Sequence, residues 1–505
     1  MDFNQIFSYV DWQLFIDQLR YDPAQPLIFS SGLFLFLFLG FSFVYMLLRR
    51  QDAARILFVT LFSYYFYYKS SGTYFFLLAI VTVSDWVLGH YIGSWVKRGD
   101  HWKRKARWLV GLSIVIDMSL LAYFKYTNFF FGSLAEIVGA NFQPWDIFLP
   151  VGISFFTFQS LSYTIDIYRG EVTPLNRLLD YAFFVSFFPQ LVAGPIVKAR
   201  DFVPQIRKPL CVTNRMFAQG FYLVLIGIFK KAVISDYISL NFVDRIFDNP
   251  SLYSGIENLL GLYGYALQIY CDFSGYSDMA IGLALLLGFR FPQNFNVPYT
   301  SASPTEFWRR WHISLSTWIR DYIYISMGGS RKGKFRTYVN LFLTMLICGL
   351  WHGAALNFIL WGALHGFALA CHKFFSQQVL HHDRHYRSTG WKRVVAVFLT
   401  FHFVVFAWML FRLDELEPMN AMINQIVYDF NPQLFWSIVT SYWTVFLLVA
   451  IGYITHWLPQ PLERRIIMAL TRCNVLVYAL LLTALIYFVI QVRSSDVQPF
   501  IYFQF

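Results

Sequence analysis

Leu27 to Leu48 reads LIFSSGLFLFLFLGFSFVYMLL, a run of 22 residues without a charge that ends at Arg49 and Arg50. As a helix, this run is long enough to cross the ~30 Å hydrocarbon layer of a bilayer. It therefore indicates an integral membrane protein. The 26 residues before it contain four aspartates and lack the basic start and small-residue cleavage site of a secretory signal, so we expect a retained anchor.

The composition of the whole chain favours the same class. Of its 505 residues, 57% are hydrophobic and only 14% are charged, which is more apolar surface than one soluble core can bury. Further apolar runs lie near residues 56–68, 73–96, 108–124, 147–167, 216–229, 258–287, 338–372, 394–411, 438–458 and 474–492. We expect an all-α polytopic membrane protein with about ten to twelve membrane helices, forming a single domain over residues 1–505.

Basic residues outnumber acidic ones by 40 to 29, which gives a net charge of +11. They stand in short loops between apolar runs, so we interpret the charge through the positive-inside rule and expect no nucleic acid partner. Basic loops at 49–55, 97–107 and 169–177 should face the cytoplasm. The acidic segment 1–26 and the connection 125–146 should then be extracytoplasmic.

No metal site is expected from the sequence. The five cysteines show neither disulfide pairing nor metal-ligand spacing. His381, His382 and His385 cluster in the polar segment 373–393, but not with the spacing of a structural zinc site. We interpret that segment as a solvated cytoplasmic loop.

Residues 178–197 form an apolar stretch with basic residues at both ends and with Pro189, Gly194 and Pro195 inside it. Both ends prefer the same side of the membrane, and the prolines and glycine disfavour a straight span. A re-entrant hairpin enclosed by protein fits this pattern, and a kinked full span is the alternative.

Ionisable residues in apolar surroundings are costly at membrane depth, so they are candidates for function. The first cluster of this kind runs from Gln268 to Met279 and reads QIYCDFSGYSDM. It places Asp272 and Asp278 inside a long apolar run. Gly275 and the small residues beside it suggest a bent or broken helix, and the two aspartates can either line a path or tie helices together.

A second cluster runs from Ser303 to Asp321 and reads SPTEFWRRWHISLSTWIRD. Trp308, His312 and Ser316 are four residues apart, so we expect them to share one helical face, along which Glu306 and Arg310 can pair. The segment carries too many charges to span the membrane. We expect it at the cytoplasmic interface or in a cavity lined by protein.

The third cluster is CGLWHG, from Cys348 to Gly353, in the most hydrophobic part of the C-terminal half. The basic segments before and after it should both be cytoplasmic, so the chain between them must enter the membrane and return. From Arg336 to His352 a helix covers ~24 Å, which is short of the hydrocarbon thickness. His352 should therefore lie within the membrane, near a turn that Gly349, Gly353 and Gly362 permit.

A neutral histidine at such a position can take a proton from a hydroxyl as its oxygen attacks an activated carbonyl. The residue chemistry alone leaves two alternatives open, because a lone histidine on a membrane helix more often serves packing or hydrogen bonding. Cys348 could share the face of His352 and form an acyl-cysteine, although a packing role suffices. His365 is expected to be structural.

At these residues the sequence resembles the membrane-bound O-acyltransferase family. It is most similar to the bacterial branch containing the membrane subunits for alginate O-acetylation and lipoteichoic-acid D-alanylation. The matching segments are LPVGISFFTFQSLSYTIDIYRG (Leu149 to Gly170), FFPQLVAGPI (Phe187 to Ile196), YCDFSGYSDMAIGLALLLGFRFPQNFNVPY (Tyr270 to Tyr299), FWRRWHISLSTWIRDYIYI (Phe307 to Ile325) and GLWHGAALNFILWGALHG (Gly349 to Gly366). They lie within a core at 149–372 and follow the family order.

The resemblance implies that His352 is the catalytic base and that His312 occupies the second family position. It also implies re-entrant segments around a central funnel or tunnel, which the donor enters from the cytoplasm and the acceptor from the other side. Candidates to line the substrate path are Trp351, Trp308, Arg310, Ser316, Asp272, Ser274, Tyr276 and Asp278.

The leading hypothesis is an O-acyltransferase of a bacterial cytoplasmic (inner) membrane. It would move a short acyl group, acetyl first, from a cytoplasmic thioester to a hydroxyl of an extracytoplasmic glycan or to a periplasmic or extracellular partner acyltransferase. No cofactor is expected to be bound, and acetyl-CoA or an acyl carrier thioester would be the donor. The alternatives are transfer of D-alanyl or a longer acyl group, or a transporter or flippase that makes no bond.

Overall fold

The computed structural model describes residues 12–23, 25–383, 386–492 and 501. Within these residues the secondary structure consists of helices, and no β-strand is present. This confirms the all-α prediction. The chain divides into two compact units. The first contains residues 1–124, 147–192 and 199–210, and the second contains 125–146, 193–198 and 211–505. The prediction of one domain over the whole chain stays a prediction.

The first unit is built from nine helical segments in its described part. They are α2 (Trp12–Leu19), α3 (Gly32–Leu47), α4 (Asp52–Ser71), α5 (Phe75–Lys97), α6 (Asp100–Leu121), α8 (Ile153–Arg169), α9 (Leu178–Ser186), α10 (Phe188–Leu191) and α11 (Ala199–Phe202), with 3₁₀ turns at Gly72–Tyr74 and Val203–Gln205.

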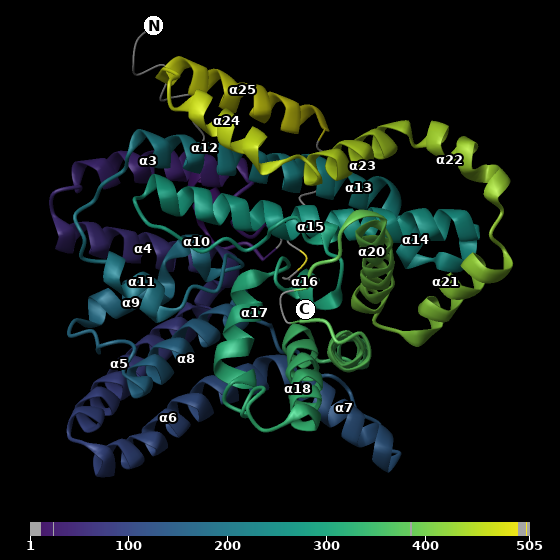
Figure 1. The fold of residues 1–505 in the computed structure, drawn as a ribbon. Helices are drawn as coiled ribbons and strands as arrows, with labels where there is room; N and C mark the ends of the chain where they lie inside the picture. The colour runs from purple at the N-terminus through teal and green to yellow at the C-terminus, as the bar shows by residue number, and fades with distance from the viewer. Residues whose placement is uncertain (1–11, 24, 384–385, 493–500, 502–505) are drawn as a thin grey trace, which may run out of the picture. The chain divides into compact units, whose positions relative to one another are not determined.

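Helices α5, α6 and α8 pack against one another in this unit (Figure 1). Asp85 of α5 joins them, because its carboxylate accepts hydrogen bonds from Ser113 Oγ of α6, at 2.7 Å, and from Ser160 Oγ of α8. A buried carboxylate is costly unless such partners compensate for its lost water. These hydrogen bonds therefore favour one relative placement of the three helices.

The stretch 178–197 is broken, as its prolines predict. Its first part forms α9 and α10, which are separated at Phe187, and both helices are too short to span a bilayer. The backbone N–H of Phe188 donates to Ser63 Oγ at 3.1 Å, and Gln190 Nε2 donates to Phe184 O. The irregular backbone thus finds its partners inside protein, which confirms a segment enclosed by protein.

The second unit holds the remaining helices. They are α7 (Thr127–Val138), α12 (Asn214–Ile228), α13 (Asp236–Ile238), α14 (Asp244–Asp248), α15 (Gly255–Leu286), α16 (Pro304–Trp308), α17 (Ile313–Ile319), α18 (Lys334–His352), α19 (Leu356–Phe374), α20 (Gly390–Arg412), α21 (Leu416–Tyr428), α22 (Phe435–Ser441), α23 (Trp443–His456), α24 (Gln460–Leu470) and α25 (Val475–Val492). Segments of π-helix at Phe229–Ser235 and Ser239–Val243 join α12, α13 and α14 into one helical stretch.

Helices α12 and α15 run alongside each other (Figure 1), and glycines bring their backbones together. A Cβ on Gly275 would lie 2.8 Å from Gly227 O, and a Cβ on Gly282 would lie 2.6 Å from Gly220 O. The prediction of a bent or broken helix around Gly275 is therefore wrong. α15 is continuous, because its glycines serve close helix packing instead of a bend.

Helices α18 and α19 form a hairpin whose connection is Gly353–Ala355. A Cβ on Gly349 would lie 2.2 Å from Phe358 O, and one on Gly362 would lie 2.6 Å from Met345 O. The predicted turn next to His352 is confirmed, and the glycines account for the close approach of the two helices.

Five helical stretches of the described chain are long and apolar enough to cross a membrane, or six if a pair bent by 95° at Tyr442 counts as one span. This is fewer than the expected ten to twelve, partly because α4 and α5 form one stretch of 46 residues. The run at 27–48 is also shorter than expected as a helix. Ser31 caps α3 by accepting the Phe34 N–H, so the helix has only 16 residues.

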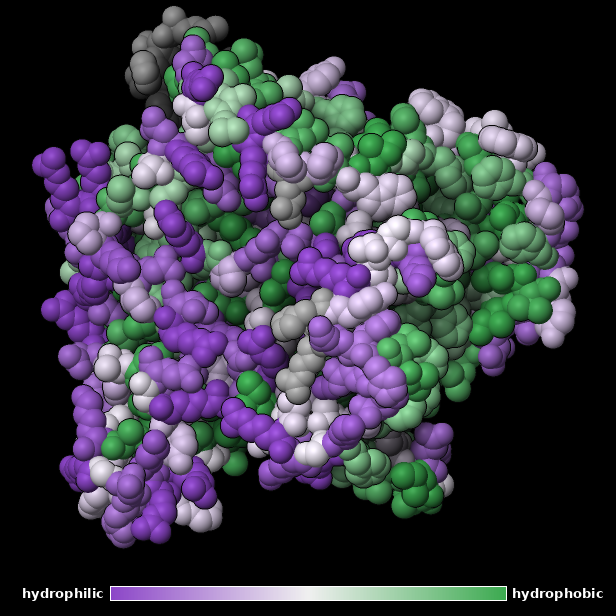
Figure 2. Space-filling model, viewed as in Figure 1, coloured by the Kyte–Doolittle hydropathy of each residue, from purple (hydrophilic) through white to green (hydrophobic). Residues whose placement is uncertain are grey.

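Apolar side chains are exposed on many of the long helices, as a lipid solvent permits. Phe36 of α3 and Leu480 of α25 are 77% and 69% exposed. On the face shown in Figure 2, hydrophobic residues gather over α14 and α21, and hydrophilic residues cover the connection between α5 and α6. The fold is that of a multi-pass membrane protein.

Candidate active site

His352 is the last residue of α18, and its side chain is almost completely enclosed, at 4% exposure. Three aromatic rings surround the imidazole. The centroids of Trp351, Trp361 and Phe411 lie 4.9, 5.1 and 5.2 Å from its own. The enclosure is not purely apolar, because His312, Lys125 and His365 lie within electrostatic range. The expectation that reactants reach His352 from two sides stays a prediction.

The C-terminal end of α18 is held by two side chains from the segment that leads into α7. The last carbonyls of a helix have no partner within it. Lys125 Nζ donates to Trp351 O at 2.6 Å and to His352 O at 2.8 Å, and Tyr126 Oη donates to Leu350 O at 2.5 Å. A cation at this end also complements the helix dipole. Lys125 and Tyr126 therefore fix the backbone that carries His352.

His312 stands at the break between α16 and α17, and it is fully buried. Its backbone is left-handed, with φ 42° and ψ 56°, a conformation that residues other than glycine rarely adopt. Asn294 holds the ring: its Oδ1 lies 3.1 Å from His312 Nδ1 and also accepts the Ser314 N–H. Because the Ser314 backbone N–H can only donate, the Asn294 side-chain atom that it contacts must be the amide oxygen, which accepts. Nδ1 of neutral His312 thus carries the proton, and Nε2 is the acceptor nitrogen.

The two histidines approach each other from segments 40 positions apart in the sequence. Trp351 neighbours both of them, with its ring centroid 6.2 Å from that of His312 and 4.9 Å from that of His352. The geometry thus brings the two predicted catalytic residues into one buried cluster.

The prediction that Trp308, His312 and Ser316 share one helical face is wrong. The helix ends after Trp308 and restarts at Ile313, because His312 has left-handed backbone angles. Trp308 Nε1 donates to His365 Nδ1 at 3.3 Å, whereas Ser316 Oγ donates to Trp311 O. His365 therefore ties α19 to α16, in line with its expected structural role.

Asp272 and Asp278 of α15 pair with two adjacent lysines. Lys231 Nζ lies 2.6 Å from Asp272 Oδ1, and Lys230 Nζ lies 2.7 Å from Asp278 Oδ2. Both aspartates thus tie helices together, and Asp272 also lines a polar cavity. The other path candidates on this helix, Ser274 and Tyr276, are buried as well.

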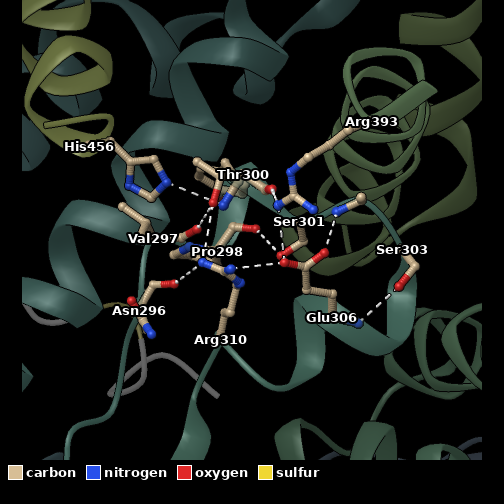
Figure 3. A network of polar contacts seen from close by, with 12 residues as sticks. Asn296, Val297, Pro298, Thr300, Ser301, Ser303, Glu306, Arg310, Arg393 and His456 are labelled. Carbon is tan, nitrogen blue, oxygen red and sulfur yellow. Dashed lines mark hydrogen bonds and ion pairs between the residues drawn. The ribbon is translucent and has the colours of Figure 1, made fainter. Parts of the chain in front are cut away.

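Arg310 belongs to a network that holds the loop before α16 (Figure 3). Its guanidinium lies 2.8 Å from Glu306 Oε1, as predicted, and donates to Asn296 O at 3.2 Å. Glu306 also accepts the Ala302 N–H and pairs with Arg393 of α20. The contacts identify Arg310 as part of the scaffold around the site.

Lys198 reaches the segment after α17, where its Nζ lies 2.7 Å from Asp321 Oδ2. Partial burial raises the pKa of Asp321, but hydrogen bonds from Arg320 and Lys198 outweigh it and lower the pKa to about 2. This carboxylate is therefore ionised at neutral pH and holds the ion pair.

No group of three or more His, Cys, Asp or Glu side chains in the described chain could hold a metal ion. All five cysteines are unbridged, and Cys348 is buried beside Gly349 in α18.

Sequence reasoning missed Lys125, Asn294 and the lysine pair Lys230 and Lys231. Lys125 falls in the predicted extracytoplasmic connection, although it stands in the aromatic run AYFKYTNFFF at 122–131. The two lysines directly follow the apolar run 216–229 and mark its predicted end. The signal is the same in both cases, because a lysine within an apolar run requires a buried partner.

These features define a multi-pass helical membrane protein with a buried site built around two histidines. A family model described as "MBOAT, membrane-bound O-acyltransferase family" matches residues 171–414. Named relatives match over most of their length. The "Probable alginate O-acetylase AlgI" of Pseudomonas aeruginosa is 44% identical over 395 residues, which cover 77% of this chain and 73% of the relative.

Two further relatives carry different names. The "Peptidoglycan O-acetyltransferase" of Helicobacter pylori is 37% identical over 79% of this chain and 80% of its own length. The "Teichoic acid D-alanyltransferase" of Bacillus subtilis is 32% identical over 53% of this chain and 70% of its own length. The chain belongs to the membrane-bound O-acyltransferase family, and it is an O-acyltransferase.

Proposed function

We propose that this chain moves an acetyl group from a cytoplasmic thioester to a hydroxyl of an extracytoplasmic glycan, or to a partner protein that completes the transfer. The donor would be acetyl-CoA or an acyl carrier thioester, and the protein would lie in a bacterial cytoplasmic membrane. The names of the relatives at 44% and 37% identity support acetyl, and the D-alanyltransferase at 32% keeps D-alanyl as the second candidate.

In this proposal His352 is the general base. The acceptor oxygen attacks the thioester carbonyl while the imidazole takes the hydroxyl proton, the C–O bond forms and the C–S bond breaks. The proton then passes to the departing thiolate, so that the products are an ester and a thiol. His312 would bind the donor or steer this proton, with its ring fixed by Asn294.

The observation that carries the proposal is the meeting of His312 and His352 around Trp351, in a cluster enclosed by protein. If His352 served only to fill space, there would be no reason for a second histidine from another segment to lie close to it. The path role proposed for Trp351 is supported by its contact with both rings. For Trp308, Arg310, Ser316, Asp272, Ser274, Tyr276 and Asp278 a path role remains a proposal beside the structural contacts described above.

The test is transfer of labelled acetyl from acetyl-CoA in membranes that contain the protein. His352→Ala should abolish transfer without unfolding the protein, and His312→Ala should reduce it strongly. His381→Ala changes an exposed histidine of the loop before α20 and should leave the rate unchanged. Turnover by a folded His352→Ala variant would remove the base from the mechanism.

The orientation in the membrane has its own test. Lys334, the first residue of α18, should be cytoplasmic, because the segments 331–336 and 373–393 are both basic. A Lys334→Cys variant, made after Cys211, Cys371 and Cys473 have been replaced by serine, should react with an impermeant thiol reagent only from the cytoplasmic side. Labelling from the opposite side would reverse the proposed direction of transfer.

A further inference from the structure

A polar cavity of about 210 Å³ lies within the second unit, between the helical stretch 231–248, α15 and the end of α20. This volume exceeds the share of one water molecule, about 30 Å³, several times over. The charged side chains that line it are four carboxylates and two cations, namely Asp236, Asp244, Asp248, Asp272, Lys231 and Arg412. The lining thus carries an excess of negative charge.

The cations of this lining are already paired with its carboxylates. Lys231 Nζ lies 2.7 Å from Asp236 Oδ1 and 2.6 Å from Asp272 Oδ1, and Arg412 lies 3.3 Å from Asp244 Oδ1. Neither cation therefore offers an unshared positive charge to an anionic ligand.

Two residues of the lining, Gln268 and Tyr265, each carry a buried polar atom without a hydrogen-bond partner in the described chain, namely Oε1 and Oη. Gln268 is 5% exposed, and its Nε2 donates to Ser239 Oγ, which in turn donates to Asp244. This chain of bonds fixes the amide and leaves Oε1 as an acceptor. Tyr265 is fully buried, and its hydroxyl supplies a donor. Buried polar atoms in proteins usually have a hydrogen-bond partner, so these two can each take one more hydrogen bond, from a ligand or from water.

Two residues of the cavity lining are sequence neighbours of residues that contact the histidines. Arg412 directly follows Phe411, whose ring contacts His352, and Asp272 directly precedes Phe273, whose ring centroid is 4.6 Å from that of His312. One residue along a helix is a rise of about 1.5 Å and a turn of about 100°. The cavity and the two histidines therefore share the helices α15 and α20 as walls.

We infer that this cavity binds an uncharged, hydroxyl-rich saccharide segment of the acceptor. The inference rests on the proposed function and names the chemical class of its acceptor. Carboxylates and the Gln268 oxygen accept hydrogen bonds from sugar hydroxyls, and Tyr265 donates one in return. The excess negative charge excludes a saccharide that carries carboxylates, because like charges in a low dielectric repel strongly.

The test measures binding to the purified full-length chain in detergent. The neutral probe is N-acetylglucosamine and the anionic probe is galacturonate, since a cavity of about 210 Å³ has room for one sugar ring. The neutral probe should raise the Tm in a saturable way, and the anionic probe should leave it unchanged. Equal or tighter binding of galacturonate, or no shift with the neutral probe, would overturn the inference. A Tm rise produced by sodium or calcium chloride alone would assign the cavity to a cation and overturn it as well.

Variants locate the binding. Tyr265→Phe removes one hydroxyl and keeps the ring, so the Kd of the neutral probe should rise about fivefold, as expected for one lost hydrogen bond. Tyr263→Phe is the matched control, because Tyr263 lies on the same helix but does not line this cavity. This substitution should not change the Kd of the neutral probe. An unchanged Kd in Tyr265→Phe would contradict the assignment.

The His352→Ala variant separates the two proposals. It should bind the neutral probe as the unmodified chain does, although it transfers no acetyl. If that variant still transfers acetyl, the proposed base fails while the binding result stands. If the neutral probe does not bind the unmodified chain, the acceptor cavity fails whatever the activity.

Discussion

Lys125→Met tests whether the end of α18 positions His352, the proposed base. Methionine keeps much of the length of lysine but removes both hydrogen bonds to the carbonyls of Trp351 and His352. Each carbonyl left without a partner costs about 1–3 kcal/mol. Loss of the buried ammonium offsets part of this, because its desolvation cost also disappears. We expect a net destabilisation of about 2 kcal/mol.

The effect on catalysis should exceed what this destabilisation alone implies. If the last turn of α18 shifts, the imidazole of His352 leaves its place among the aromatic rings, and a displacement of ~1 Å can cost about 100-fold in rate. We expect kcat for acetyl transfer to fall about 10- to 100-fold in protein that remains folded at the assay temperature.

The assay compares kcat, KM and Tm of Lys125→Met with those of Tyr126→Phe and Lys97→Met. Tyr126→Phe loses one hydrogen bond to Leu350 O, so it should cost about 1 kcal/mol and a smaller part of kcat. Lys97 is exposed at the end of α5, and its substitution should change neither quantity. A Lys125→Met enzyme with normal kcat would refute the positioning argument.

The packing and polar contacts support three further predictions. Gly275→Leu should prevent stable folding, because the Cβ of the new leucine would lie 2.8 Å from the backbone oxygen of Gly227 in α12. The measurement is the loss of the monodisperse peak in size-exclusion chromatography in detergent. A stable variant would show that the two helices can separate. Asn294→Ala should lower kcat more than it changes KM, because the His312 ring loses the partner that orients it. A kcat equal to that of the unmodified chain would show that this contact has a structural role only. The stabilisation from the Asp321 ion pair with Lys198 should be complete above pH ~4. This stabilisation should be lost as the pH falls towards about 2, the lowered pKa of the Asp321 carboxyl. The Tm difference between the unmodified chain and Asp321→Asn should therefore shrink between pH ~4 and pH ~2. A Tm difference that stays constant over this range would contradict the ion pair.

The fold class and the hairpin at His352 could be predicted because their signals are local. Long uncharged runs require a lipid solvent, and basic segments on both sides of His352 predict a hairpin with that residue near its turn. The structure has this hairpin, with the connection directly after His352.

The surroundings of the site could not be predicted, because they depend on pairings between distant segments. Local sequence shows glycine at position 275, but not that Gly227 of another helix lies against it. A four-residue spacing predicts a continuous helix through His312, and only the hydrogen bonds of Asn294 reveal why the chain breaks there. The partners of Lys125 are 226 and 227 positions away, beyond the reach of any local pattern.

The adjacent lysines of the second unit bear on how the chain enters the bilayer. On an isolated helix, each lysine near the membrane centre raises the insertion free energy by about 2.5–3.5 kcal/mol. Lys230 and Lys231 lie in the middle of the helical stretch 214–248, and their counter-ions Asp278 and Asp272 are synthesised 48 and 41 residues later. Asp236 lies in the same stretch and can pair with Lys231 at once, whereas Lys230 gains the counter-ion Asp278 only when α15 has been made. The insertion of this stretch should therefore be completed together with that of α15.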